Sequence, residues 1–204
     1  AVAEAEKKTT GEIVPVVATQ SDTYDRAEDV FGLALGSLAL VLVWFFFQEV
    51  RPYEGEWRPV LGVVELLASF LIAWILGVFL ATRVPFIKRV FVGPWGFRSR
   101  VEAAAEEVFA RTAARRTRAA TGIVLYVSLL ERVVSVRAEQ AISEKVDPKE
   151  WTVICEGMTR SLREGRHREG FIDAIAMCGD LLARHFPAAP GDVNELTNEL
   201  HLID

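Results

Sequence analysis

The chain has 204 residues, enough for one or two domains, and its net charge of −5 argues against a general nucleic-acid-binding protein. Hydrophobic residues make up 51% of the chain although 25% of it is charged, so the apolar residues must be concentrated in one region. The two cysteines, Cys155 and Cys178, are too few for a disulfide framework, and we expect two buried free thiols.

Residues 1–29 predict the end of a helix followed by a strand. The helix gives way at residues 9–11, and the β-branched run EIVPVVAT that follows has the length of a strand. Pro15 lies in the middle of this run and indicates an edge strand or a bulge, because proline cannot donate a ladder hydrogen bond. This piece is too short to fold alone and needs partners later in the chain.

Two long apolar runs follow, at about residues 30–50 and 60–81. A membrane-spanning helix needs about 20 mostly apolar residues, and a core helix of a soluble protein rarely stays apolar on every face for so long. Glu65 is the only charged residue of the second run and lies about one turn inside it. It could reach the near interface, face its partner helix or serve a function.

The connection between the runs is short and contains three helix breakers, Pro52, Gly55 and Pro59. We therefore predict an antiparallel transmembrane hairpin, with the lipid bilayer as a partner and the rest of the chain on one side of it. The candidates for an interfacial aromatic belt are Trp44, Tyr53, Trp57 and Trp74.

Basic residues near the helix ends predict the orientation. The connection carries Arg51 and Arg58, whereas the other side carries Arg26, Arg83, Lys88, Arg89, Arg98 and Arg100. The positive-inside rule then places the polar part in the cytoplasm. We expect an integral membrane protein of a bacterial inner membrane.

The residues after the hairpin predict one more helix and two more strands. Residues 101–120 are helical in pattern, with one face made by Val101, Ala105, Val108, Phe109 and Thr112 and a basic end made by Arg111, Arg115, Arg116 and Arg118. Two apolar runs, 123–128 and 133–136, flank a polar break at Glu131 and Arg132 and read as a β-hairpin.

Two helices and a short polar tail complete the chain. One helix starts at Asp147 and Pro148 and ends at Gly165, and the next runs to Pro187. The element order fits a small mixed sheet with helices packed on it, an α/β fold. Residues 1–29 and 101–204 would form this domain together, and residues 30–100 would be an inserted membrane hairpin with a membrane-proximal linker.

Three stretches carry a resemblance to a known family. TTGEIVPVV, TGIVLYVSLLERVVSVRAEQAI and the C-terminal GFIDAI…GDLLA.HFP resemble the TPM domain family, in particular its branch with an inserted transmembrane hairpin. The resemblance implies a three-layer α/β/α sandwich. Members are linked to calcium binding, acid phosphatase activity, repair of photosynthetic complexes and modulation of membrane partners. This chain has RAEQAI at 137–142 where the family has Gly-Tyr-Gly-Leu-Glu.

One end of the predicted sheet collects carboxylates. Glu12 starts the first strand, Glu139 follows the third and Asp147 comes soon after. Carboxylate oxygens are the ligands that Ca²⁺ prefers, so these three residues are candidate metal ligands. The alternative is that they are ordinary exposed or salt-bridged groups. We expect no organic cofactor.

The opposite end of the sheet carries a second set of polar residues: Ser21, Asp22, Asp25, Ser128, Glu131 and Arg132. If the first two strands are parallel, this is their carboxyl end, where ligands of open α/β sheets bind. The alternative is a plain hairpin turn with a local pair between Glu131 and Arg132.

The sequence leaves two hypotheses of function. It contains no Ser/His/Asp order, Walker loop or CxxC motif. This favours a membrane-anchored interaction or regulatory module that binds a protein partner, with Ca²⁺ as the candidate ion, in membrane-protein or envelope maintenance. The second hypothesis is a membrane-anchored, metal-dependent acid phosphatase, for which the family resemblance is the only argument. We expect no nucleic-acid partner.

Overall fold

The computed structural model describes residues 1–47, 50–53, 56–59, 61–112, 121–189, 194 and 196–203. Its contacts divide the chain into two compact units. We call Ala1–Asp22 with Trp95–Asp204 the α/β unit, and Thr23–Pro94 the hairpin unit. The predicted residues Arg115, Arg116 and Arg118 lie outside the described part.

The α/β unit is built on a four-stranded mixed sheet with the strand order β5-β4-β1-β6. Strand β1 (Glu12–Ala18) pairs in parallel with β4 (Gly122–Ser128), and β4 pairs antiparallel with β5 (Val133–Ala138). The sequence predicted these three strands. It did not predict β6 (His201–Ile203), which pairs in parallel with β1, so the expectation of a merely polar tail was wrong.

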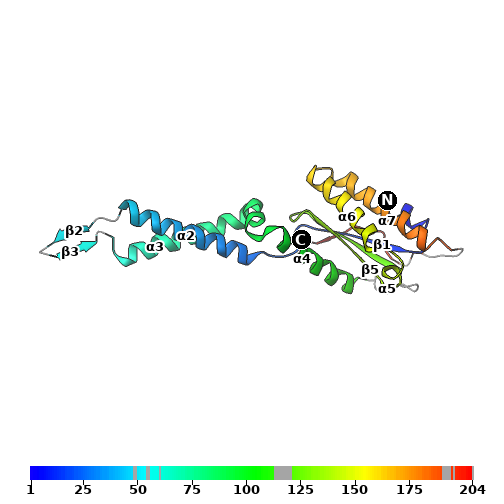
Figure 1. The fold of residues 1–204 in the computed structure, drawn as a ribbon, viewed down its shortest axis with the longest axis horizontal. Helices are drawn as coiled ribbons and strands as arrows, with labels where there is room; N and C mark the ends of the chain where they lie inside the picture. The colour runs from blue at the N-terminus through cyan, green and yellow to red at the C-terminus, as the bar shows by residue number, and fades with distance from the viewer. Residues whose placement is uncertain are drawn as a thin grey trace. The chain divides into compact units, whose positions relative to one another are not determined.

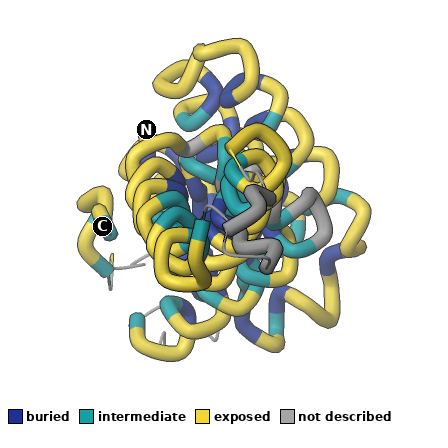
Figure 2. The backbone as a smooth tube through the Cα atoms, turned by 90° about the vertical axis from the view of Figure 1, so that its left-hand side faces the viewer, coloured by how far each residue is buried: buried dark blue, intermediate teal, exposed yellow. Residues whose placement is uncertain are grey.

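Helices cover both faces of this sheet (Figure 1). One apolar cluster joins the sheet to α1 (Val2–Glu6), α6 (Pro148–Arg163) and α7 (His167–His185). A second cluster joins the other face to α4 (Pro85–Arg111) through Val101, Ala105 and Phe109. Along the helical turns drawn in Figure 2, buried and intermediate residues alternate with exposed ones. The unit is thus a three-layer α/β/α sandwich, as the family resemblance implied.

Helix boundaries follow the local signals at most places. The Asp147 carboxylate accepts the Lys149 N–H (2.9 Å) at the start of α6, and Gly165 has a φ of 78° just after its end. The short helix α5 (Gln140–Ser143) lies between β5 and α6. The predicted start of the helix before β4 was wrong, because α4 begins at Pro85 rather than at residue 101. A proline is well placed at a first helical position, where its missing N–H costs nothing.

Pro15 lies within β1 where no neighbouring strand needs its N–H. The Thr19 N–H donates to the Ile203 carbonyl of β6 (2.9 Å), and successive N–H groups of a strand alternate in direction. Pro15 therefore falls on the same edge as Thr19, but β6 pairs only with residues 16–18. In its first residues, before the part paired with β6, β1 is therefore an edge strand, as Pro15 predicted.

The hairpin unit consists of α2 (Asp25–Phe47) and α3 (Val63–Arg83), joined through an antiparallel ribbon of β2 (Val50–Tyr53) and β3 (Glu56–Pro59). The sequence predicted a plain loop instead of this ribbon. A two-stranded ribbon has only edge strands, which is where proline is tolerated.

Glycines let the two helices approach closely. A Cβ on Gly32 would lie 2.6 Å from Val78, and one on Gly77 would lie 2.8 Å from the Cα of Gly32. Gly36 faces Phe70 in the same way, which shows that the helices run antiparallel. Both helices are long and apolar enough to cross a membrane, and only 11% and 6% of their apolar windows are buried, which is unlike a core helix.

Two glycines of the α6–α7 layer should respond oppositely to alanine. A Cβ on Gly179 of α7 would lie 2.6 Å from the Cβ of Ala5, so Gly179→Ala should force α1 away and destabilise the fold by about 1–3 kcal/mol. Gly157 of α6 has open space around it, so Gly157→Ala should stabilise by about 0.5–1 kcal/mol through helix propensity. Chemical denaturation followed by circular dichroism measures both, and equal effects of the two substitutions would contradict this packing.

Candidate functional site

A polar cluster lies at the carboxyl end of β1 and β4, the end at which the sequence predicted a site. The Ser21 hydroxyl bonds to the Ser128 hydroxyl (3.0 Å) and to the Tyr126 hydroxyl (3.2 Å). The Glu131 carboxylate accepts the Ser21 N–H (2.8 Å) and the Ser128 hydroxyl proton. The structure therefore brings Ser21, Ser128 and Glu131 together, and we call these residues with Tyr126 the Glu131 cluster.

Strand direction explains this arrangement. Because β1 and β4 are parallel and Ala18 is the register partner of Ser128, the chain leaves both strands at the same edge of the sheet. The tight turn into β5 then carries Glu131 back over that edge. The turn needs a left-handed residue, and Arg132 supplies it with a φ of 53° while its side chain is exposed.

Tyr126 is the member of the cluster that the sequence did not predict. It sits inside an apolar strand run, where the default reading is a core residue, and it is almost completely buried. Burial is the main cause that raises the pKa of its hydroxyl, and the nearby Glu131 carboxylate adds to the effect. The signal that could have revealed its role is its hydroxyl, because a buried Tyr hydroxyl needs a partner.

Asp22 and Asp25 take separate positions. The Asp22 carboxylate forms an ion pair with Arg100 of α4, and both side chains are about one third exposed. Asp25 is an exposed residue at the start of α2 and belongs to the hairpin unit. The Arg100 pair joins the residue before the hairpin unit to the residues that follow it, since Asp22 and Trp95 are the borders of the α/β unit.

The Glu131 cluster fastens the chain at this edge of the sheet. Ser128 is fully buried and Glu131 is 8% exposed. Their hydrogen bonds hold Ser21, close to the point where the chain passes into the hairpin unit. Buried polar networks in which every group has a hydrogen-bond partner stiffen the backbone around them.

The amino end of the sheet contains the three residues predicted to bind a metal ion, Glu12, Glu139 and Asp147. The Glu139 carboxylate accepts the Gly122 N–H (2.8 Å), which caps the start of β4. Asp147 is an exposed helix cap, and Glu12 is buried at the start of β1. In the described part of the chain no three His, Cys, Asp or Glu side chains are placed to hold a metal ion, and calcium binding stays a prediction.

Glu6 is the residue at this end that the sequence did not single out. Its carboxylate accepts the Ile13 N–H (3.0 Å), and Glu12 and Asn198 lie close enough to influence its pKa. Burial, followed by the effect of the neighbouring Glu12, raises the pKa of Glu6 to about 6.

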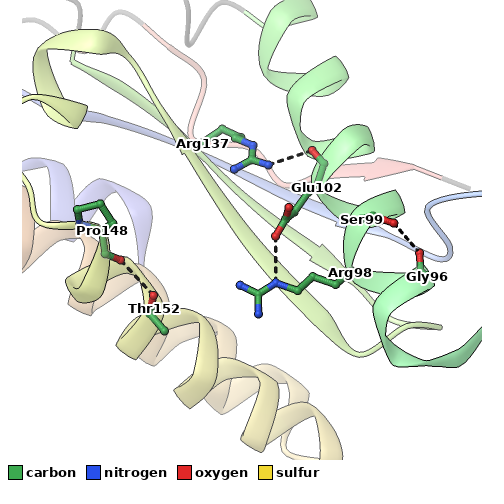
Figure 3. Close-up of polar contacts among 7 residues, drawn as sticks. All are labelled: Gly96, Arg98, Ser99, Glu102, Arg137, Pro148 and Thr152. Atoms are coloured by element: carbon green, nitrogen blue, oxygen red, sulfur yellow. Dashed lines mark hydrogen bonds and ion pairs between the residues drawn. The ribbon is translucent and has the colours of Figure 1, made fainter.

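The two cysteines are buried or half-buried, and Arg137 of β5 contacts a helix. Both thiols are free, and burial raises the pKa of Cys155 to about 11 and that of Cys178 further, so both stay protonated at neutral pH. Arg137 of β5 donates to the Glu102 carbonyl of α4 (3.2 Å), while Arg98 donates to the Glu102 carboxylate (3.0 Å), as Figure 3 shows. The Arg137 bond ties α4 to the edge strand β5, while the Arg98–Glu102 pair lies within α4.

A segment of the chain and its fold both resemble known proteins. Residues 90–181 match the TPM domain family. A similar solved structure is the NMR structure of the BA42 protein from the psychrophilic bacterium Bizionia argentinensis, with 15% identity and a TM-score of 0.55 over 98% of this chain and 86% of that one. No curated protein sequence matches significantly.

The comparison confirms part of the resemblance. The TPM match covers α4 to α7, and the BA42 likeness, at its low identity, shows the α/β fold alone. The placement in the hairpin-bearing branch of the TPM family stays a prediction, as does every activity linked to that family.

Removing the Glu131 carboxylate should loosen the carboxyl end of the sheet. Glu131→Ala leaves the Ser21 N–H and the buried Ser128 hydroxyl without an acceptor, which should lower the free energy of unfolding by about 2 kcal/mol. The matched control is Glu107→Ala, which removes an exposed pair with Arg111 and should cost less than about 1 kcal/mol. Chemical denaturation compares them, and equal losses would show that the cluster does not hold the chain.

Glu6 should make the fold less stable as the pH rises. Its folded pKa of about 6 lies above the ordinary value of 4.5, so the fold favours the protonated form. That contribution is complete below pH 4.5 and is lost as the pH passes 6; for a half-exposed group it amounts to about 1 kcal/mol. Denaturation between pH 5 and 7 should show this slope in the wild type and not in Glu6→Gln. The exposed Glu4→Gln is the control, and a slope that survives in Glu6→Gln would exclude this assignment.

Proposed function

We propose that the chain is a membrane-anchored protein-interaction module, in which the hairpin unit spans the bilayer and the TPM-like α/β unit binds a partner protein. The observation that carries this proposal is the exposure of the hairpin unit. Leu38 and Ile72, near the middle of α2 and α3, are 53% and 60% exposed, and their neighbours on the outer faces are exposed as well. Apolar surface of this extent is costly in water and favourable in lipid.

The contacts between α2 and α3 support a bilayer setting. Small residues allow the two backbones to meet at Gly32, Gly36 and Gly77, which is the packing that membrane helices use in place of a hydrophobic driving force. Trp44 lies near one end of the apolar run of α2, and Trp74 packs against Gly32 near the other end. The side chains of Tyr53 and Trp57 lie outside the described part.

A binding role fits the α/β unit better than a catalytic one. The polar side chains at both ends of its sheet donate to or accept from the unit's own backbone and one another, through Glu6, Glu131 and Glu139. No observation in the described residues favours the phosphatase alternative, which stays a prediction. Basic residues flank the helix ends on the side of the α/β unit, including Arg83, Arg98 and Arg100, so we place this unit in the cytoplasm.

Anchoring should depend on the exposed residues of the hairpin unit. The double substitution Leu38→Arg/Ile72→Arg puts two charges at the centre of the spans, at about 2.5–3.5 kcal/mol each, and should move the protein out of the carbonate-resistant membrane fraction. The control is Val153→Arg/Ile172→Arg, two comparably exposed residues of α6 and α7, which should stay in that fraction. Extraction of the wild type by carbonate would end the proposal.

The same membranes test the orientation. Lys149→Cys introduces an exposed thiol on α6, and the native thiols give little background because their pKa values are raised by burial. A membrane-impermeant maleimide should label it in opened cells only. Labelling in intact cells would place the α/β unit outside.

A further inference from the structure

Strand β6 is held far more weakly than the strand it pairs with. Every residue of β1 except Val17 is buried, whereas no described residue between 194 and 203 is buried. Leu200 is 47% exposed and Leu202 is 73% exposed. Since Leu202 and Ile203 point to opposite faces of the sheet, β6 buries part of one apolar side chain against the α4 face and leaves the other uncovered.

Few contacts fasten this strand. Three residues of β6 pair with Val16, Val17 and Ala18, and the Thr19 N–H donates to the Ile203 carbonyl (2.9 Å). Leu196 and Ile203 pack partly against the cluster under α4. The side chain of Asn198 also lies close enough to the Glu6 carboxylate to lower its pKa. Elements with few buried apolar contacts are the first to open locally.

The edge of β1 accepts a strand only where β6 now lies. In the part of β1 that precedes residue 16, the Ile13 N–H already donates to the Glu6 carboxylate (3.0 Å), and Pro15 has no N–H. Both features are known ways in which proteins prevent strand addition. The part of this edge that can pair with a strand is therefore limited to residues 16–19, where β6 now lies. This limit also fixes the register of any strand that replaces β6.

We propose that β6 is a displaceable occupant of this edge, and that an extended segment of the partner protein replaces it by adding in parallel to residues 16–19 of β1. This inference rests on the proposed function as an interaction module. The chain's own strand defines the chemistry of the ligand: a β-forming segment with an apolar side chain at the position of Ile203, facing α4. A partner that also covers the α1–α7 face beside Leu202 would bury more apolar surface than β6 does, so it would compete favourably.

A synthetic peptide with the sequence of residues 194–204, NELTNELHLID, serves as the probe, added to the full chain in detergent micelles. In the wild type, β6 occupies the edge, and the peptide can bind only while β6 is detached. Its apparent affinity is therefore the affinity for the free edge multiplied by the fraction of molecules in which β6 is detached. Ile203→Asp weakens docking of the chain's own strand, so it should bind the peptide at least about ten-fold more tightly than the wild type. Leu202→Asp is the matched control: it places the same charge on an exposed neighbour and should bind like the wild type.

A disulfide provides the complementary test. Val17 and Leu202 are register partners, so Val17→Cys/Leu202→Cys can fix β6 in place when oxidised. The oxidised protein should not bind the peptide, and reduction should restore binding. Equal binding in both states would mean that the peptide adds outside β6, which would overturn displacement.

The amide chemical shifts of β1 and β4 in Ile203→Asp should match those of the wild type, which shows that the variant is folded. If this folded variant does not bind the peptide, the proposal is refuted. Hydrogen exchange of the wild type gives a measurement without substitutions: the β6 amides should exchange at least about a hundred-fold faster than those of β4. Equal protection would refute displacement. These results do not depend on the carbonate extraction, so failure of the anchor and failure of the strand site can be distinguished.

Discussion

The structure depends on the pairing of β1 with β4. These strands lie side by side from Glu12 and Gly122 to Ala18 and Ser128, although the whole hairpin unit and α4 separate them in the chain. The entropy of closing so long a connection grows only slowly with its length, and the intervening unit is itself ordered. Both strands are buried on both faces, so the apolar area of this pair holds together the layers formed by α4 and by α1, α6 and α7.

Acidic side chains complete the ends of this sheet. Glu6, Glu131 and Glu139 each accept a backbone N–H, from Ile13, Ser21 and Gly122 respectively, and Asp147 caps helix α6 through the Lys149 N–H. Buried or partly buried N–H groups need such partners, and a carboxylate is a strong acceptor. Two of the candidate metal ligands, Glu139 and Asp147, thus have a structural role, while metal binding itself stays a prediction.

Side-chain contacts hold the residues that come just before the hairpin unit. Ser21 is fixed by the Glu131 cluster and Asp22 by Arg100, so the last residues before the insertion are tied to β4, to the β4–β5 turn and to α4. The opposite edge of β1 is different, because β6 covers it with three mostly exposed residues. The residues before the hairpin unit are thus held by side-chain contacts, whereas this edge of the sheet is covered by a short, mostly exposed strand.

The sequence by itself determined the local features of this protein. The length and composition of residues 31–47, the β-branched run around Val14, the Asp147–Pro148 helix start and the Gly165 stop each reflect short-range propensity or solvation, which a few neighbouring residues decide. Only the tertiary structure decided the role of Glu6, the hydroxyl contacts of Tyr126 and the existence of β6. Each of these depends on residues far apart in the chain, and β6 in particular is too short and too polar in its surroundings to form without the edge of β1.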